Sequence, residues 1–325
     1  MSTTEPLRRV EDGHVVVLTR VPEVVLERLR ARTRVTDVSG LPREAWATAL
    51  ADATGVLSSS SVSIGAPFLA EAPALRIVAQ QSVGYDNVDL AALRARGVAL
   101  TNSRGSLNEA VADLAFWLVV AAVRNFGRAL AWARSGRWME QPDAPYGHDV
   151  AGATLGIVGL GAIGAAVTRR AQLSGMRVIY SNRKPREDDA STGAAYRPFD
   201  AMLAEADCVL LLVPLSAETR GMFDEAAFSK MKPSATLVNA ARGAIVDTAA
   251  LLRALDAKTI AGAALDVTDP EPIPADHPLQ NRDDVLITPH MGSATFETRT
   301  RMAMYAAENL IAFLDGEPLK TPIAL

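Results

Sequence analysis

A glycine-rich hexapeptide constrains the fold of this chain more than any other stretch. Residues 159–164 read GLGAIG, between a strand-like run, TLGIV, and a helix-like run, AIGAAVTRRAQLSG. In that context Gly159 makes a tight turn, Gly161 lets a pyrophosphate approach the backbone, and Gly164 lets the helix pack against the strand. The start of the helix offers free N–H groups to phosphates. The sequence therefore predicts a dinucleotide site at this turn, which also includes Leu160, Ala162 and Ile163.

The composition fits a soluble globular protein. The 325 residues suffice for two domains, and 49% are hydrophobic and 22% charged. A net charge of −4 argues against binding to nucleic acid, which requires clustered positive charge. The longest apolar run, AFWLVVAAV, is too short to cross a bilayer, and the first twenty residues lack the apolar stretch of a signal peptide. We expect a cytoplasmic protein with no membrane partner.

Metal-ligating residues are scarce. The chain has four histidines and one cysteine, Cys208, in the apolar run DCVLLLVP. One cysteine forms no internal disulfide and builds no zinc site. We expect no metal ion, and we expect Cys208 to be a small buried apolar side chain.

The hydrophobic pattern alternates strand-like and helix-like runs in both halves of the chain, as parallel sheets require. We predict two Rossmann-like or flavodoxin-like domains with the active site in the cleft between them. The substrate-binding domain is predicted to be discontinuous, residues 1–103 plus 293–325, and the dinucleotide-binding domain to span residues 104–292. Ser106 and Glu109 are spaced as a capping box that begins a buried helix. A closing helix is predicted from Thr295 to Leu314, ended by Gly316.

The position that reads the adenosine ribose holds an amide. An acid is expected there, about 20 residues after the first glycine, but Asn182 occupies it and Arg183, Lys184 and Arg186 follow. An amide does not repel a 2′-phosphate, and guanidinium–phosphate bonds are strong. The sequence predicts a preference for NADP(H), with NAD(H) possible. The alternative is a solvated basic loop, since the acids Glu187, Asp188 and Asp189 come next.

Three polar side chains follow predicted strands of the second domain. Arg242 lies in NAARGAIVD, Glu271 in LDVTDPEPIP and His290 in ITPHMGSAT. A cation, a carboxylate and an imidazole at one sheet edge suit acid–base chemistry on an anionic substrate. Each also has a structural interpretation: Arg242 as a surface ion pair, Glu271 as a loop acid, and His290 as a core histidine.

Six ordered motifs carry a resemblance to a known family: QSVGYDNVDL, VGLGAIG, PLSAETRGMF, MKPSATLVNAARGAIVD, LDVTDPEPIPADHPL and ITPHMGSAT. The chain resembles the D-isomer-specific 2-hydroxyacid dehydrogenases, and within them the glyoxylate/hydroxypyruvate reductases. The resemblance implies that His290 donates a proton to the substrate carbonyl, that Glu271 favours the charged ring and orients it, and that Arg242 holds the substrate carboxylate.

The same resemblance assigns further binding residues. It implies that the backbone N–H groups of Val83 and Gly84 bind the substrate carboxylate, and that Asp266 meets the nicotinamide carboxamide. Other positions implied to line the cofactor are Val111, Val213, Pro214, Thr219, Ala240, Ala241, Arg242, His290 and Gly292.

The expected activity is NADPH-dependent reduction of glyoxylate or hydroxypyruvate to a D-2-hydroxyacid. One alternative is an NAD-dependent D-2-hydroxyacid or 3-phosphoglycerate-type dehydrogenase, which commonly has an extra regulatory domain. Another is a nucleotide-sensing module like the co-repressor of the same family, which shares the three catalytic positions. The family also implies a homodimer, in which an aromatic side chain of one subunit reaches the partner's active site. In the irregular stretch before Gly152, the candidates are Trp138 and Tyr146, and the alternative is that neither does so.

Overall fold

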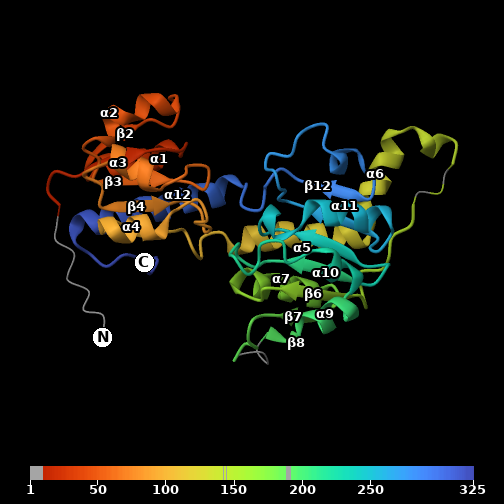
Figure 1. Cartoon of the computed structure of the whole chain (residues 1–325). Coiled ribbons are helices and arrows are strands. Elements are labelled where there is room, and N and C mark those ends of the chain that lie inside the picture. The colour runs from red at the N-terminus through yellow and green to blue at the C-terminus, as the bar shows by residue number, and fades with distance from the viewer. Residues whose placement is uncertain (1–9, 142, 144, 188–191) are drawn as a thin grey trace. The chain divides into compact units, whose positions relative to one another are not determined.

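A computed structural model of the chain describes residues 10–141, 143, 145–187 and 192–325. It contains two α/β units (Figure 1): one comprises the described residues up to Leu107 together with Thr295–Leu325, and the other is Asn108–Ala294. Each is built on a parallel sheet, so the predicted fold class is confirmed. The predicted boundaries, after residues 103 and 292, and the predicted place of the active site stay predictions.

The N-terminal unit contains a five-stranded parallel sheet in the order β2-β1-β3-β4-β5. This is the flavodoxin-like order, produced by right-handed crossovers that pass through helices on both faces. The strands are β1 (His14–Val17), β2 (Arg34–Asp37), β3 (Gly55–Ser58), β4 (Ile77–Gln80) and β5 (Ala99–Thr101).

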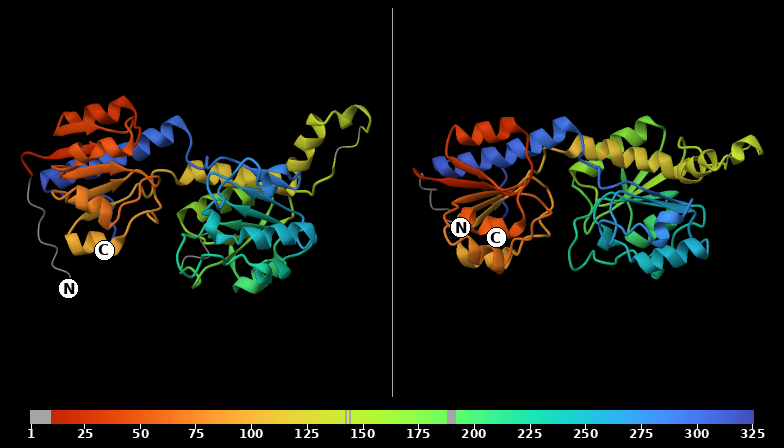
Figure 2. Two further views of the ribbon diagram at one scale, coloured as in Figure 1. Left: turned by 45° about the horizontal axis from the view of Figure 1, so that its top comes forward. Right: turned by 90° about the horizontal axis from the view of Figure 1, so that it is seen from above.

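Helices cover both faces of this sheet (Figure 2). Alternate strand residues point to opposite faces, so Val15 and Val17 pack against α1 (Glu23–Arg30) and α12 (Phe296–Asp315), whereas Val16 packs on the other side. That side carries α2 (Ala47–Leu50), which follows the 3₁₀ turn η1 (Arg43–Trp46), α3 (Ala66–Glu71) and α4 (Leu90–Arg96). One face of the N-terminal sheet is therefore closed in part by the last helix of the chain.

The second unit contains a seven-stranded parallel sheet in the order β12-β11-β10-β9-β6-β7-β8. The order reverses direction between β6 and β9, which is the switch point where such sheets bind ligands. The strands are β6 (Thr154–Val158), β7 (Arg177–Ser181), β8 (Ala195–Tyr196), β9 (Cys208–Leu211), β10 (Thr236–Asn239), β11 (Gly262–Leu265) and β12 (Val285–Ile287). Because all of them are parallel, their carboxyl ends share one edge of the sheet.

Two layers of helices enclose the second sheet. One face is covered by α5 (Asn108–Val123) and α7 (Ala162–Leu173), which lie side by side in Figure 1. The other is covered by α9 (Phe199–Glu205), α10 (Glu225–Ser229) and α11 (Thr248–Asp256). This unit also contains α6 (Phe126–Arg134) and the 3₁₀ turns η2 (Arg137–Met139), η3 (Gly243–Ile245) and η4 (Pro278–Asn281).

The ends of two predicted helices differ in outcome. Helix α12 begins after Thr295, whose hydroxyl accepts the N–H of Thr298, and ends at Gly316, as the sequence predicts. The capping box at Ser106 is wrong: α5 begins two residues later, and the Ser106 hydroxyl donates to Ser103 O at 2.7 Å. Glu109 instead pairs with arginines of α7, because the helices pack side by side and ion pairs across them are within reach.

Cys208 is fully buried in β9, as expected from its apolar run. Burial raises the pKa of its thiol to about 12. Among the described residues, no single helix is long and apolar enough to cross a membrane; α5 and α6 taken together have the length and composition for a span, but they are bent by 71°.

Candidate functional site

Glu271 and His290 form an ion pair at the carboxyl edge of the seven-stranded sheet. Glu271 follows β11 and His290 follows the adjacent strand β12, so sheet order alone brings them together. The His290 Nδ1 atom lies 2.6 Å from Glu271 Oε1, and about two fifths of each side chain is exposed. Within the described part of the chain, the other ring nitrogen, Nε2, has no hydrogen-bond partner.

The pair lowers the pKa of the Glu271 carboxyl. The hydrogen bond from His290 is the largest cause; partial burial opposes it, and the charges of His290 and Arg242 reinforce it. Glu271 is therefore ionised through the neutral pH range, and its negative charge faces the Nδ1 side of the imidazole.

Asp266 organises the turn that carries His290. Its carboxylate, 3% exposed, accepts hydrogen bonds from the Thr288 hydroxyl (2.7 Å) and from the N–H groups of Met291 (2.8 Å) and Gly292 (2.9 Å). The His290 backbone has a φ of 49°, a left-handed conformation that is uncommon for a residue with a side chain. These bonds hold His290 in that conformation. A carboxylate has about four acceptor sites, so Asp266 retains one for the nicotinamide carboxamide that the family resemblance predicts as its partner.

Arg242 follows β10, the next strand of the sheet, and is half-buried. Its Nη1 donates to Ala241 O at 2.8 Å, and its own carbonyl accepts from the buried Asn239 side chain at 2.9 Å. The next residue, Gly243, lies against the loop after β11: a Cβ added there would be 1.9 Å from Thr268 O. Only glycine permits this approach, which brings the Arg242 loop against the loop of Glu271.

The glycine-rich turn has the geometry of a phosphate cradle. Gly159 has a φ of 97°, and a Cβ there would lie 2.8 Å from the Val213 side chain, so glycine is required for two reasons. A Cβ on Gly161 would meet nothing within 4 Å, which leaves room for a ligand. Helix α7 begins at Ala162, and the N–H groups of Ala162, Ile163 and Gly164 have no acceptor within the described ranges. These residues fit a dinucleotide pyrophosphate.

Asn182 is engaged with the glycine-rich turn. Its Oδ1 accepts from Leu160 N at 2.8 Å, and Arg186 Nη1 donates to Leu160 O at 2.9 Å. Arg183 and Lys184 are exposed and have no hydrogen-bond or ion-pair partner among residues 10–187 and 192–325 that the structure describes. The predicted basic cluster therefore divides into one structural arginine and two available cations. Asp188 and Asp189 lie outside the described residues.

The loop after β4 presents two unpaired amides. Val83 and Gly84 are half-buried, and their N–H groups donate to no acceptor in the described part of the chain. Unpaired N–H groups are rare unless a ligand or water binds them. Two adjacent donors of this kind match the requirement of a carboxylate.

The remaining predicted cofactor residues lie at strand ends or on α5. Val111 of α5 contacts the position of Gly292, where a Cβ would lie 3.5 Å from a Val111 methyl group. The Thr219 hydroxyl donates to Pro214 O at 2.7 Å and accepts from Ser216 N, so it shapes the loop after β9. Val213 lies two residues after the end of β9, and Ala240 and Ala241 are the first two residues after β10. All of them belong to the Asn108–Ala294 unit.

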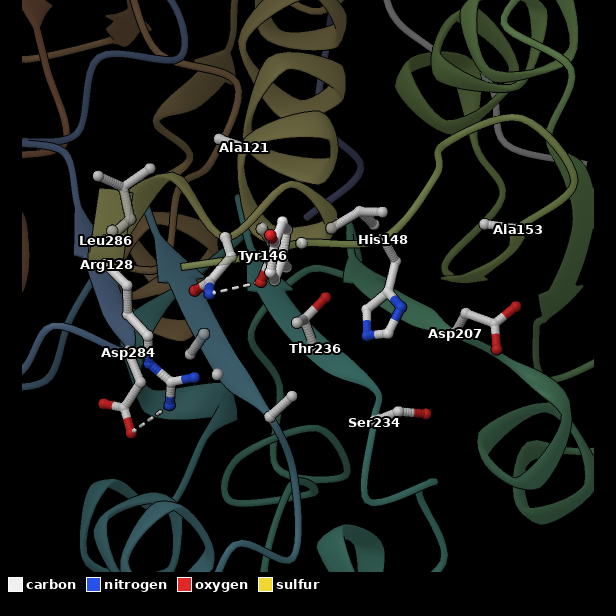
Figure 3. A pocket seen from close by; sticks show the side chains of 18 of the residues that line it. Ala121, Arg128, Tyr146, His148, Ala153, Asp207, Ser234, Thr236, Asp284 and Leu286 are labelled. Atoms are coloured by element: carbon white, nitrogen blue, oxygen red, sulfur yellow. Dashed lines mark hydrogen bonds and ion pairs between the residues drawn. The ribbon is translucent and has the colours of Figure 1, made fainter. Parts of the chain in front are cut away.

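A separate cavity lies at the opposite edge of the same sheet (Figure 3). It measures about 520 Å³, and its lining includes Ala153, Asp207, Thr236 and Asp284, which stand at the amino ends of their strands. The ion pair of His290 and the glycine-rich turn stand at the carboxyl ends. This cavity is therefore no part of the candidate active site.

Comparison with known proteins decides the family. Residues 116–292 match the profile of the D-isomer specific 2-hydroxyacid dehydrogenase, NAD binding domain. The chain belongs to this family. It is 47% identical over 269 residues to a glyoxylate reductase of Korarchaeum cryptofilum, a match that covers 82% of this chain and 81% of that protein. It is therefore an NAD(P)-dependent oxidoreductase, similar to glyoxylate reductases.

Two solved structures of the family are similar throughout. The glyoxylate reductase of Paecilomyes thermophila superposes with a TM-score of 0.88 at 30% identity, over 96% of this chain and 98% of that one. An NADPH-dependent glyoxylate/hydroxypyruvate reductase of Sinorhizobium meliloti, in complex with NADP and malonate, gives a TM-score of 0.84 at 33% identity, over 96% and 97%.

Proposed function

We propose that this protein reduces small 2-oxoacids, glyoxylate and hydroxypyruvate among them, to D-2-hydroxyacids, with NADPH as the preferred cofactor. The hydrogen-bonded pair of Glu271 and His290 carries the proposal, because it provides a proton donor beside a fixed negative charge at a ligand-binding edge. The similarity to glyoxylate reductases supports the substrate class.

In the proposed mechanism, Glu271 holds Nδ1 of His290, so Nε2 is the nitrogen that faces the substrate. Protonated His290 donates the Nε2 proton to the carbonyl oxygen as that oxygen gains negative charge, and neutral His290 removes the proton in the reverse direction. A reduced nicotinamide cofactor held at the glycine-rich turn would supply the hydride that the carbonyl carbon accepts. Arg242 pairs with the substrate carboxylate and polarises the carbonyl, while the N–H groups of Val83 and Gly84 also bind the carboxylate.

The cofactor preference follows from charge at the adenosine ribose. Asn182 stands where an acid would repel the 2′-phosphate, and Arg183 and Lys184 are the cations available for it. Arg186 supports the site indirectly through its bond to Leu160 O. That the similar Sinorhizobium meliloti reductase is NADPH-dependent supports the same preference.

We also propose that the protein is a cytoplasmic homodimer. Helix α6 has no buried residue, and apolar side chains are exposed on it and on the stretch after it, including Leu130, Trp138, Met139 and Tyr146. Met139 is 92% exposed, and an apolar surface of this kind favours burial against another chain. Sedimentation velocity of the wild type measures the oligomeric state directly, and a single monomeric species at micromolar concentration would contradict the proposed dimer.

The test of the proposed activity is an initial-rate panel of glyoxylate, hydroxypyruvate, pyruvate and phosphohydroxypyruvate, each with NADPH and with NADH. We expect the highest kcat/KM with glyoxylate or hydroxypyruvate and NADPH. A preference for phosphohydroxypyruvate and NADH would favour the 3-phosphoglycerate-type alternative. No turnover of any pair, together with tight NADPH binding, would favour the nucleotide-sensing alternative.

Substitutions test the catalytic roles. His290→Ala and Arg242→Ala are each expected to lower kcat/KM by at least about a thousandfold and to leave NADPH affinity nearly unchanged. His148→Ala is the matched control, since this histidine lines the cavity at the other edge of the sheet. Wild-type rates in both catalytic variants would remove the basis of the proposed mechanism.

A further inference from the structure

The loop that presents the amides of Val83 and Gly84 is held by the end of β5. Ser103 N donates to Ser82 O at 3.1 Å, and the side-chain Nδ2 of Asn102 donates to Val83 O at 2.9 Å. Two successive carbonyls of the loop are thus bound by two successive residues that follow β5.

These bonds determine where the two unpaired N–H groups point. A trans peptide unit is planar, and its C=O and N–H point in opposite directions. Ser82 O and the N–H of Val83 belong to one such unit, and Val83 O and the N–H of Gly84 belong to the next. Fixing both carbonyls toward β5 therefore turns both N–H groups away from it, where they have no acceptor in the described residues.

Asn102 is itself fixed by the C-terminal segment. Its side chain is buried, its carbonyl accepts the Thr321 hydroxyl, and its N–H donates to Thr321 O at 3.3 Å. Thr321 Oγ1 accepts from Nδ2 of Asn309 in α12 at 3.0 Å, and Asn309 Oδ1 accepts from Lys320 N at 2.9 Å. Asn309, Thr321 and Asn102 form a continuous buried polar chain from α12 to the loop.

The rest of the loop is secured without Asn102. Asn87 Nδ2 donates to Val62 O at 2.6 Å, and Asn87 Oδ1 accepts from Gln80 at 3.0 Å. Val88 N also closes a turn onto Tyr85 O. The bond from Asn102 to Val83 O is therefore directed at one peptide unit, and the fold of the loop has other supports.

We propose that Asn102, supported by Thr321, is a positioning residue that aims the N–H groups of Val83 and Gly84 at the substrate carboxylate. The inference rests on the proposed function, in which those amides bind the 2-oxoacid. Without the side chain of Asn102, the Val83–Gly84 peptide unit rotates more freely, and the carboxylate loses a donor of fixed direction.

The experiment compares Asn102→Ala and Thr321→Val with a matched control, Thr101→Val. Thr101 is the neighbour of Asn102, is equally buried, and has a hydroxyl with no hydrogen-bond partner in the described residues. Both Thr→Val changes keep the side-chain shape, but only Thr321→Val removes hydrogen bonds of the polar chain, namely those to Asn102 O and from Asn309 Nδ2. The measurements are KM and kcat for glyoxylate with NADPH, the inhibition constant of oxamate, the dissociation constant of NADPH and the melting temperature.

For Asn102→Ala we expect KM for glyoxylate and the inhibition constant of oxamate to rise about tenfold, as loss of one buried hydrogen bond predicts. Thr321→Val should raise both by about threefold, and Thr101→Val should change neither. The fall in kcat should be smaller than the rise in KM, and NADPH affinity should stay constant.

A folded Asn102→Ala variant with wild-type KM and oxamate inhibition would overturn the inference, and so would a variant whose NADPH affinity falls in the same proportion. If Asn102→Ala fails to fold, Thr321→Val decides: the same effect as Thr101→Val contradicts the proposed role. A wild type that reduces no 2-oxoacid overturns the proposed function itself, a result distinct from either of these.

Discussion

Replacing Glu271 by glutamine removes the charge beside His290 and nearly keeps its shape. The structure gives the size of the effect. A hydrogen bond to a charged group contributes about 1.5–3 kcal/mol when buried, but Glu271 and His290 are 40% and 42% exposed, so solvent screening reduces this to about 1 kcal/mol. A loss of about 1 kcal/mol from the transition state corresponds to about a fivefold fall in kcat/KM for glyoxylate in the variant.

The pH dependence of this effect follows from the lowered pKa of the Glu271 carboxyl. A carboxyl with a lowered pKa is charged at neutral and alkaline pH, and it loses its charge only as the pH falls through that lowered pKa. In the proposed mechanism, the difference in kcat/KM between the wild type and Glu271→Gln should therefore be complete at neutral and alkaline pH and should shrink only in acid.

The assay is kcat/KM against pH from about pH 5 to pH 10 in both directions. Glu225→Gln serves as the control because it breaks an exposed ion pair on α10, with Arg253, and should leave both profiles unchanged. If kcat/KM of Glu271→Gln equals that of the wild type at neutral and alkaline pH, the charge of the carboxylate does not contribute to reduction, and the proposed mechanism lacks its central interaction.

Three other predictions concern the cofactor site, a close backbone approach and the thiol. Arg183→Ala combined with Lys184→Ala should raise KM for NADPH at least about tenfold more than KM for NADH, because only NADPH has the 2′-phosphate; equal changes would make this a solvated loop. Gly243→Ala should lower the free energy of unfolding by more than about 2 kcal/mol in urea titrations, because its Cβ would overlap a backbone carbonyl. Gly40→Ala is the control and should be nearly neutral, because a Cβ at Gly40 would lie in open space. Similar urea midpoints for the two variants would refute the close approach at Gly243. Cys208, buried and with a pKa of about 12, should resist thiol reagents at pH 8 until the protein is unfolded, and rapid native labelling would contradict that burial.

Sequence periodicity predicted the fold well because both sheets are parallel and buried on two faces. Most of these strands are short apolar runs, and the ends of the following helices can be recognisable, as Thr295 and Gly316 show for α12. Local pattern misled at Ser106, whose hydroxyl donates to Ser103 O, three residues earlier, while α5 begins only at Asn108. The competing bond closes a local turn before the helix, and the spacing of Ser106 and Glu109 does not reveal it.

The site was predictable only in part. Family motifs located Glu271 and His290, and the strand order of the sheet explains why they meet. The residues that support the site were missed. Thr288 donates to Asp266, which holds the turn of His290. Asn239 donates to Arg242 O, and Asn102 donates to Val83 O. A signal exists for all three, because each is a polar residue placed at or just after the end of a buried strand. Its partner cannot be read from sequence, since the bond joins loops whose approach depends on the whole sheet.

The position of α12 has a consequence for synthesis of the chain. This helix covers one face of the N-terminal sheet, yet it is encoded at the other end of the sequence. While the ribosome makes residues 108–294, β1, β3 and β4 already exist with apolar side chains of that face uncovered, and Asn102 lacks Thr321. The second unit is complete first, and the N-terminal unit closes only after the last helix emerges. A nascent chain that stalls before residue 296 therefore carries one finished unit and one with an exposed apolar face, a suitable substrate for chaperones.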